Sequence, residues 1–326
     1  MNEAGYLVSV VIPAFQQTDL LRRTVESLLD CDLPPDQFEV IVVDGSPDDT
    51  NQKMVEAVAA RAPFRLRCVR KAPEGPGPSR NLGAQSTSGT FIAFMDSDCM
   101  ASPEWLRMGT SAFEDGIGIV QGRTLPDPAG KPSFRTWHLQ VEQETPYYET
   151  ANVFYRRSAF EQGHGFSGDL HPTHDKPMGG EDVVAAWSVI RAGWKTRFEP
   201  RALVYHAIVP LPIHRSLFIK HHYVVPWLVA QFPELRRFLV GGVFLSRGHA
   251  AVAAGLVADL LLLAFRQFSI PLLAAPWLLY AVLNWREPGK SKGVLRLLRI
   301  GAHLVRDTSS VFVMLAGSLK FRCLVL

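Results

Sequence analysis

The chain has 326 residues, enough for one large domain or for a domain with an appendage. Its net charge is only +3, so no global field favours nucleic acid, and we expect no nucleic-acid partner. The four cysteines show neither metal-ligand spacing nor a disulfide framework. The first residues lack a basic region followed by an apolar core, the pattern of a secretory signal. These features favour a reducing, cytosolic setting for residues 1–210.

Short apolar runs alternate with helical stretches in the first hundred residues. The first run is β-branched and is stopped by Pro13, which is typical of a buried parallel strand. Strands and helices that alternate at this spacing argue for a doubly wound, mostly parallel α/β sheet with right-handed crossovers. Four segments are predicted as strands, namely 6–15, 38–44, 64–70 and 91–95.

Three polar clusters follow predicted strands or open the helices between them. Sheets of this class bind ligands at the carboxyl ends of their strands, so we expect the three clusters to meet in one binding crevice. The clusters are Asp44-Gly45-Ser46, Pro78-Ser79-Arg80-Asn81 and Asp96-Ser97-Asp98.

Asp96 and Asp98 stand one residue apart directly after a predicted core strand. Two carboxylates so close repel each other unless a positive group lies between them. Hard oxygen ligands suit Mg²⁺ or Mn²⁺, which take substrate phosphates as further ligands. The pair therefore predicts a divalent metal site, and the alternative is an ordinary surface turn.

Two of the clusters have features suited to a nucleotide. Asp44 could accept a hydrogen bond from a base N–H and Ser46 could contact ribose, although turn chemistry or a helix cap would also explain them. Arg80 lies early in a predicted helix, where a basic residue is normally disfavoured. A bound phosphate would reverse that preference, whereas a solvated arginine is the alternative.

The looser pattern from residue 134 to 210 contains two further candidates. Glu181 and Asp182 begin a predicted helix that Gly193 closes, and one of them could act as a general base. Acids are also favoured there by the helix dipole alone. His206 ends a short predicted strand and could be structural or could complete a metal shell. Two more segments are interpreted, 151–157 as an edge strand and 171–175 as a mobile loop rather than a zinc site.

The last third of the chain is strongly apolar. Segments 248–265 and 268–283 each fall just short of the about 20 residues that a membrane-spanning helix needs. They predict a membrane-embedded hairpin, and the alternative is a hydrophobic helical pair that is buried in protein or lies in the membrane interface. Residues 293–307 form a basic amphipathic pattern suited to an anionic membrane surface, or to packing on the main domain.

Taken together, four stretches resemble family 2 glycosyltransferases with a GT-A fold. They are "VSVVIPAF", "EVIVVDGSPDDT", "GPSRNLGAQSTSGTFIAFMDSD" and "GGEDVVAAWSVIRAGWKTRFEPRALVYH", in that order, and they cover about residues 6–208. The resemblance implies metal-dependent transfer of a sugar from a nucleotide sugar to an acceptor hydroxyl, with inversion at the anomeric carbon. No Gln-X-X-Arg-Trp sequence follows, so we expect a single-sugar transferase.

The resemblance also implies a role for each candidate residue. The nucleotide sugar would be a UDP-, GDP- or dTDP-sugar, and the metal would be Mn²⁺ or Mg²⁺. By position, Asp182 matches the catalytic base, with Glu181 beside it. The residues that would bind the donor are Pro13, Asp44, Ser46, Arg80 and Asp96. The residues that would bind the metal are Asp98, Asp96 and His206.

These observations give one prediction for the whole chain. Residues 1–210 form the catalytic domain, 211–237 an amphipathic linker, and 238–326 the hydrophobic hairpin with a basic tail. We expect a bacterial-type cell-membrane protein whose catalytic domain faces the cytoplasm, because basic residues flank the hairpin. The acceptor would be a lipid-linked sugar or a cell-envelope glycan precursor. A nucleotidyltransferase and a catalytically inactive membrane scaffold are the competing interpretations.

Overall fold

The computed structural model describes residues 5–133, 135–170, 179–266, 270–285 and 294–326. The chain divides into two compact units. The first comprises Met1–Pro132 and Trp137–Val209, and the second comprises Ser133–Thr136 and Pro210–Leu326. The predicted segment 171–175 lies outside the described residues.

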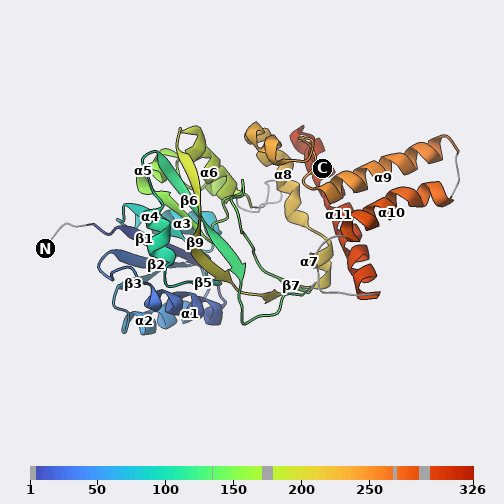
Figure 1. Ribbon diagram of the computed structural model, residues 1–326. Helices are drawn as coiled ribbons and strands as arrows, with labels where there is room; N and C mark the ends of the chain where they lie inside the picture. Colours follow the sequence, from blue (N-terminus) through green and yellow to red (C-terminus); the bar gives the residue numbers. More distant parts are fainter. Residues whose placement is uncertain (1–4, 134, 171–178, 267–269, 286–293) are drawn as a thin grey trace. The chain divides into compact units, whose positions relative to one another are not determined.

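An eight-stranded sheet forms the centre of the first unit, with the order β3-β2-β1-β4-β8-β6-β9-β5 (Figure 1). The four predicted strands are confirmed and run parallel to one another. Their order places the first and fourth predicted strands side by side, which is the doubly wound pattern. Their bounds are β1 (Val8–Ala14), β2 (Phe38–Asp44), β3 (Arg65–Arg70) and β4 (Phe91–Phe94).

The remaining strands make the sheet mixed. β8 (Val153–Arg156) pairs antiparallel with both β4 and β6, so it is central, and the prediction of an edge strand there was wrong. Its four residues include three that are buried, because helices cover both of its faces. The others are β5 (Cys99–Ala101), β6 (Ile117–Pro126) and β9 (Lys195–His206), and β7 (Thr136–Trp137) pairs with β10 (Val209–Pro210) as a separate ribbon.

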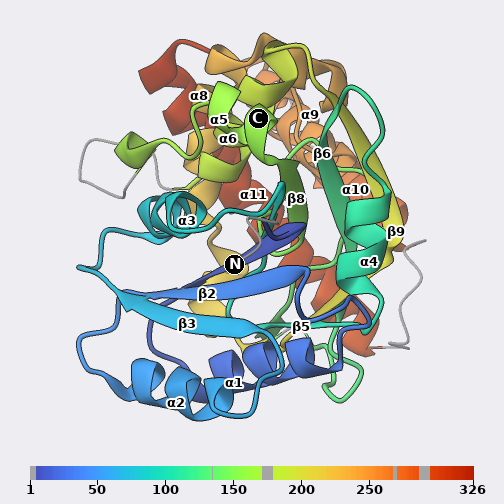
Figure 2. The same ribbon diagram turned by 90° about the vertical axis from the view of Figure 1, so that its left-hand side faces the viewer.

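Helices cover both faces of the sheet, as Figure 2 shows. One hydrophobic cluster joins the sheet to α1 (Thr18–Ser27), α2 (Thr50–Ala59) and α4 (Trp105–Ser111). A second joins it to α3 (Pro76–Gln85), α5 (Arg157–Gln162) and α6 (Glu181–Arg191). A Cβ at Gly83 would lie 2.3 Å from Val11, so only glycine lets α3 approach the sheet this closely. Two short 3₁₀ helices complete the unit, η1 (Leu28–Asp30) and η2 (Gly168–Leu170).

The second unit is helical. The predicted hairpin corresponds to α9 (Arg247–Ala264) and α10 (Ile270–Trp285), and the basic segment begins α11 (Val294–Phe321), which is longer than predicted. Among the described residues only α9 is long and apolar enough to cross a membrane. Short helices precede it: α7 (Ile213–Leu217), η3 (Lys220–Val224), α8 (Val225–Gln231) and η4 (Pro233–Phe238).

Candidate active site

The pairing of β5 with β9 brings Asp98 and His206 together from distant parts of the chain. Cys99 lies opposite His206 in this antiparallel pair, and the amide of Ala207 donates to the backbone carbonyl of Asp98 at 2.8 Å. Nε2 of His206 lies 3.6 Å from Oδ2 of Asp98. The two side chains thus face one another at the end of the sheet.

His206 is held in an orientation suited to metal ligation. Its Nδ1 lies 2.7 Å from the carbonyl oxygen of Ala207, and only a protonated Nδ1 can donate to that acceptor. This tautomer leaves the lone pair of Nε2 directed toward Asp98. The indole of Trp137 meets the imidazole edge-on, with ring centroids 4.7 Å apart, and fixes the ring from the other side.

The donor set around Asp98 fits a hard divalent cation. Burial raises the pKa of the Asp98 carboxyl, the neighbouring imidazole of His206 opposes that rise, and Asp96 adds to it. A cation between Asp98 and His206 would offset this cost of burial. Cys99 Sγ falls within 4.8 Å of the other two ligand atoms, but burial raises the pKa of its thiol well above the usual range. Asp98 and His206 could therefore act as ligands of such a cation, whereas the protonated thiol of Cys99 could not.

Arg80 connects the two acidic motifs. Its guanidinium contacts Asp96 Oδ1 at 2.8 Å and Glu181 Oε1 at 3.3 Å. The residue is only 4% exposed and lies over the ring of Phe166, with 5.6 Å to the centroid, so the solvated-arginine alternative is wrong. Asp96 and Asp98 thus have separate partners in this structure, Arg80 for the first and His206 for the second.

Asp182 has the properties of a general base. It is the second residue of α6, after Glu181, and the N-cap Gly180 has a φ of 88° that gives the sharp entry into the helix. Burial raises the pKa of Asp182 to about 8, and the charge of Glu181 adds to this. The amide of Val183 and the guanidinium of Arg80 oppose the rise. Once ionised, a carboxylate with this raised pKa is a stronger base than an ordinary aspartate.

A buried polar cluster forms beside the ends of β1 and β2. Oδ1 of Asp44 accepts hydrogen bonds from the amide and hydroxyl of Ser46, at 3.1 and 2.6 Å, and from Nδ2 of Asn51 at 3.0 Å. The Ser46 hydroxyl also accepts from the amide of Gln16, so Ser46 caps no helix here. Pro13 lies next to this cluster, one residue from the pairing of Ala14 with Asp44.

The second carboxylate oxygen of Asp44 is buried and accepts no hydrogen bond from the described residues. Gln16 and Gln17 both have positive φ, 57° and 54°, a costly conformation, and the backbone of Gln16 is hydrogen-bonded to Ser46 and Asn51 of this cluster. An N–H from a bound base would satisfy the second oxygen of Asp44.

Several contacts of the site were not predicted from the sequence. Asn51 completes the Asp44 cluster, Trp137 packs on His206 and Phe166 lies under Arg80. Glu149 lies near enough to raise the pKa of Asp182 further. Asn51 directly follows "DDT" and could have been named from the sequence, whereas the other three contacts depend on pairing between distant segments.

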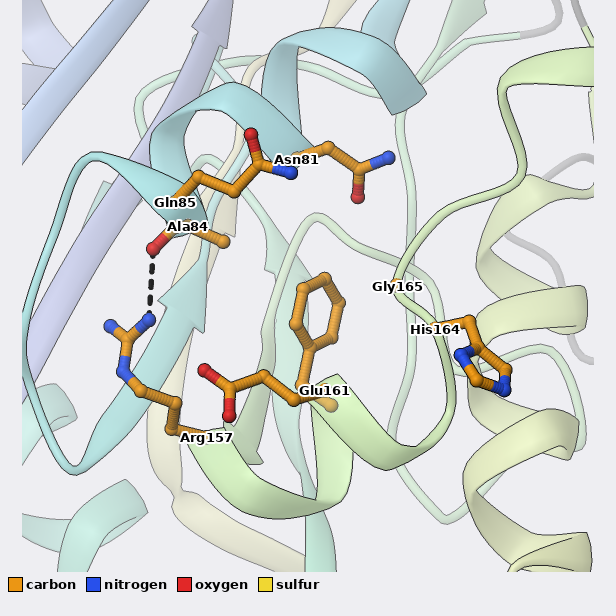
Figure 3. A pocket seen from close by; sticks show the side chains of 8 residues that line it. Asn81, Ala84, Gln85, Arg157, Glu161, His164 and Gly165 are labelled. Atoms are coloured by element: carbon orange, nitrogen blue, oxygen red, sulfur yellow. Dashed lines mark hydrogen bonds between the residues drawn. The ribbon is translucent and has the colours of Figure 1, made fainter.

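A separate pocket of about 260 Å³ opens between α3 and α5 (Figure 3). Its lining includes Asn81 from the second predicted polar cluster, together with Gln85, Glu161 and His164, but none of the residues to which a catalytic, donor-binding or metal-binding role was assigned. Arg157, at its edge, donates to the backbone carbonyls of Gly89 and Ala84 and so is engaged in structure.

The sequence model of glycosyl transferase family 2 matches residues 9–171, which is 163 of the 326 residues. The chain belongs to glycosyltransferase family 2. The matched range contains the Asp44 cluster, Arg80, Asp96 and Asp98. The predicted family and GT-A fold are confirmed.

Named relatives share part of the chain. Glycosyltransferase AglE of Haloferax volcanii is 24% identical over 198 residues, which cover 56% of this chain and 65% of AglE. The pre-mycofactocin glycosyltransferase of Mycobacterium tuberculosis is 30% identical over 217 residues, 61% of this chain and 42% of that protein. The chain therefore spans less than two thirds of either relative.

Solved structures share the fold. The mannosyltransferase PcManGT from Pyrobaculum calidifontis, in complex with GDP-Man and Mn²⁺, aligns with a TM-score of 0.58 at 17% identity over 98% of this chain and 88% of that one. Residues 1–349 of TarS from S. aureus, in complex with UDP, align with a TM-score of 0.50 at 18% identity over 96% and 91%.

Proposed function

We propose that the chain transfers a single sugar from a nucleotide sugar to an acceptor hydroxyl, with inversion at the anomeric carbon. The observation that carries this proposal is the contact of Arg80 with both Asp96 and Glu181. It joins the residues proposed for the donor diphosphate to those proposed for the acceptor. This contact brings both groups of residues into one site, which a direct displacement requires.

Asp182 takes the proton of the acceptor hydroxyl through its carboxylate oxygen. The hydroxyl oxygen then forms a bond to the anomeric carbon while the bond from that carbon to the diphosphate oxygen breaks. Nucleoside diphosphate leaves with the electron pair of the broken bond. The guanidinium of Arg80 would balance the negative charge of the diphosphate. An α-linked donor thus gives a β-linked product.

Asp98 and His206 would hold the divalent cation, Mn²⁺ or Mg²⁺, with Asp96 next to it. When bound, such an ion supplies Lewis-acid neutralisation of the diphosphate. PcManGT and GalNAc-T7, two structural neighbours, are described with Mn²⁺, which supports the proposal.

The Asp44 cluster would bind the base and ribose. The unpaired oxygen of Asp44 can accept the ring N–H of uracil, thymine or guanine, so UDP-, dTDP- and GDP-sugars all fit. Ser46 would face the nucleoside, and Pro13 would form the floor beside it.

A lipid-linked sugar or cell-envelope glycan precursor is the proposed acceptor, with the protein at the cell membrane and its catalytic unit in the cytoplasm. Support comes from the second half of α9, where Val257, Leu260, Leu261 and Leu263 are all exposed. Apolar side chains on all sides of a helix are typical of burial in protein or lipid. Flotation of the full chain with vesicles tests this placement, and a protein that stays at the bottom of the gradient with every lipid mixture would contradict it.

Release of nucleoside diphosphate tests the reaction. Detergent-purified protein is incubated with a panel of UDP-, GDP- and dTDP-sugars, Mn²⁺ or Mg²⁺, and a membrane lipid extract. One donor should give metal-dependent release that the lipid extract raises and that Asp182→Asn abolishes. Pyrophosphate release from a nucleoside triphosphate would instead identify a nucleotidyltransferase. Nucleotide binding without any turnover would identify a scaffold.

A further inference from the structure

Tyr155 carries a buried hydroxyl that neither the fold nor the proposed reaction uses. The residue belongs to β8, in the middle of the sheet, and is 0% exposed. Its Oη accepts and donates no hydrogen bond within the described part of the chain. A buried hydroxyl without a partner is costly, and phenylalanine would fill the same space without that cost.

The ring of Tyr155 is fixed by aromatic neighbours. It meets Phe94 and Phe160 edge-on, with centroid distances of 5.9 and 5.4 Å. Phe94 is the last residue of β4, two positions before Asp96. Tyr155 therefore packs against the strand that precedes the segment proposed to bind the metal. With this packing the phenol has little freedom to turn elsewhere.

The first turns of α6 pack on the same part of the sheet as Tyr155. Ala185 and Ala186 share one buried cluster with Tyr155. Asp182 precedes these alanines by three and four positions, so it lies on the same face of the helix, one turn nearer its start. Of the charges acting on Tyr155, that of Asp182 is the strongest, followed by those of Tyr148 and Arg80.

We propose that Tyr155 is a positioning residue for Asp182. Its hydroxyl donates a hydrogen bond, through one bridging water, to the ionised carboxylate of Asp182. That bond fixes the orientation in which the carboxylate takes the acceptor's proton. The inference rests on the proposed function, because it assigns Asp182 as the base.

Other groups also act on Asp182, and their effects must be separated from that of Tyr155. Glu181 on its own helix and Glu149 in the loop before β8 both favour the protonated carboxyl, whereas Arg80 on α3 favours the ionised form. Tyr155 would join Arg80 in favouring the ionised form, because a hydrogen bond to a carboxylate stabilises its charge.

The test is Tyr155→Phe, which removes one oxygen atom and keeps the ring. Loss of the bond should lower kcat about tenfold, leave KM for the donor unchanged and move the base limb of the pH profile upward by about one pH unit. The melting temperature should stay the same or rise, since no partnered group is lost. Unchanged kcat and pH profile would overturn the proposal, as would a fall in kcat with no shift of the profile.

Tyr148→Phe is the matched control. Tyr148 is also buried, but its hydroxyl contacts Glu144 and Thr196 at 3.0 and 3.3 Å. Its removal should lower the melting temperature and leave the pH profile in place.

An NMR titration of the Asp182 carboxyl carbon, assigned with Asp182→Asn, separates the inference from the proposed function. The pH midpoint of the Asp182 titration should be higher in Tyr155→Phe than in the wild type, even if the protein transfers no sugar. A midpoint that does not move would overturn the inference while leaving the transferase activity intact.

Discussion

Oδ2 of Asp98 lies 3.6 Å from Nε2 of His206. The residue next to Asp98, Cys99, is the strand partner of His206, although 107 positions separate these two partners in the sequence. The register of β5 on β9 produces this contact, since Cys99 stands opposite His206. The hydrogen bond between His206 Nδ1 and the carbonyl of Ala207 then selects the tautomer. The pair proposed to hold the metal is thus brought together by backbone pairing rather than by a local motif alone.

Replacing either member of this pair should weaken metal binding. Asp98→Asn and His206→Gln should each lower Mn²⁺ affinity by at least about 10–100-fold, the cost known for weaker outer-shell changes. Electron paramagnetic resonance of free Mn²⁺ measures this directly. Cys99→Ala is the control and should bind Mn²⁺ as the wild type does, because its thiol stays protonated. Normal affinity in Asp98→Asn would show that the ion binds elsewhere.

The raised pKa of Asp182 predicts how activity depends on pH. The base must be ionised, so kcat/KM should rise with pH and level off above a midpoint near 8. Asp182→Asn should remove this limb together with the activity. A profile already flat from pH 6 to 9 would mean that another group, or none, takes the proton.

The same carboxyl should reduce stability as pH rises. Its folded-state pKa of about 8 exceeds that of an unfolded aspartate, about 3.9, so the folded state binds more protons between these values. The free energy of unfolding therefore falls as pH rises through this window. Asp182→Asn should melt at a higher temperature than wild type at pH 8, and the difference should close below pH 4. Equal melting temperatures at both pH values would contradict the assigned pKa.

Arg80 should contribute to stability and should lower the pH at which Asp182 ionises. Arg80→Met leaves Asp96 and Glu181 without their shared cation, and the cost should stay below the roughly 3–5 kcal/mol of a fully buried pair. The reason is that the Asp96 side chain is 33% exposed. Urea unfolding measures this loss. The midpoint of the pH profile should also move upward, because Arg80 lowers the pKa of Asp182.

Arg67→Met serves as a control for the removal of an arginine. Arg67 lies 3.7 Å from Glu39, away from the candidate site, so its loss should leave the pH midpoint unchanged. A midpoint that moves equally in both variants would exclude a specific role for Arg80.

The orphaned oxygen of Asp44 predicts a specific effect on nucleotide binding. Asp44→Asn replaces an acceptor with an amide and should weaken UDP, dTDP or GDP binding by about 10–100-fold, the loss of one hydrogen bond to a charged group. Calorimetric titration with the three diphosphates measures it and shows which base is preferred. Asp48→Ala removes a nearby exposed carboxylate and should change little. Equal losses in the two variants would exclude a direct contact from Asp44.

Much of the catalytic unit follows from local sequence patterns. The continuous apolar runs predicted β1, β2 and β4 because strands buried on both faces need no alternation, whereas the alternating pattern of residues 64–70 predicted β3. The short run at β8 is also continuous, yet it was interpreted as an edge strand. Its neighbours β4 and β6 come from distant segments, and pairing of that kind leaves no local trace.

The site shows the same division. Asp98 and Asp182 could be named as candidates from the sequence because the first closely follows a predicted core strand and the second lies at the start of a predicted helix. The role of Arg80 as a link between Asp96 and Glu181 could not be predicted, since the contact to Glu181 joins residues 101 positions apart. The orphaned hydroxyl of Tyr155 was equally invisible, because a tyrosine in a strand is ordinary until its hydroxyl is found without a partner.

The anomer released when water replaces the acceptor tests the central claim most directly. Full-length protein, Mn²⁺ and an α-linked nucleotide sugar are followed by proton NMR within the first minutes, before the free sugar equilibrates. A single displacement assisted by Asp182 predicts that the β-anomer appears first and that Asp182→Asn releases none. The α-anomer appearing first would contradict direct displacement and, with it, the role of Asp182 as the base.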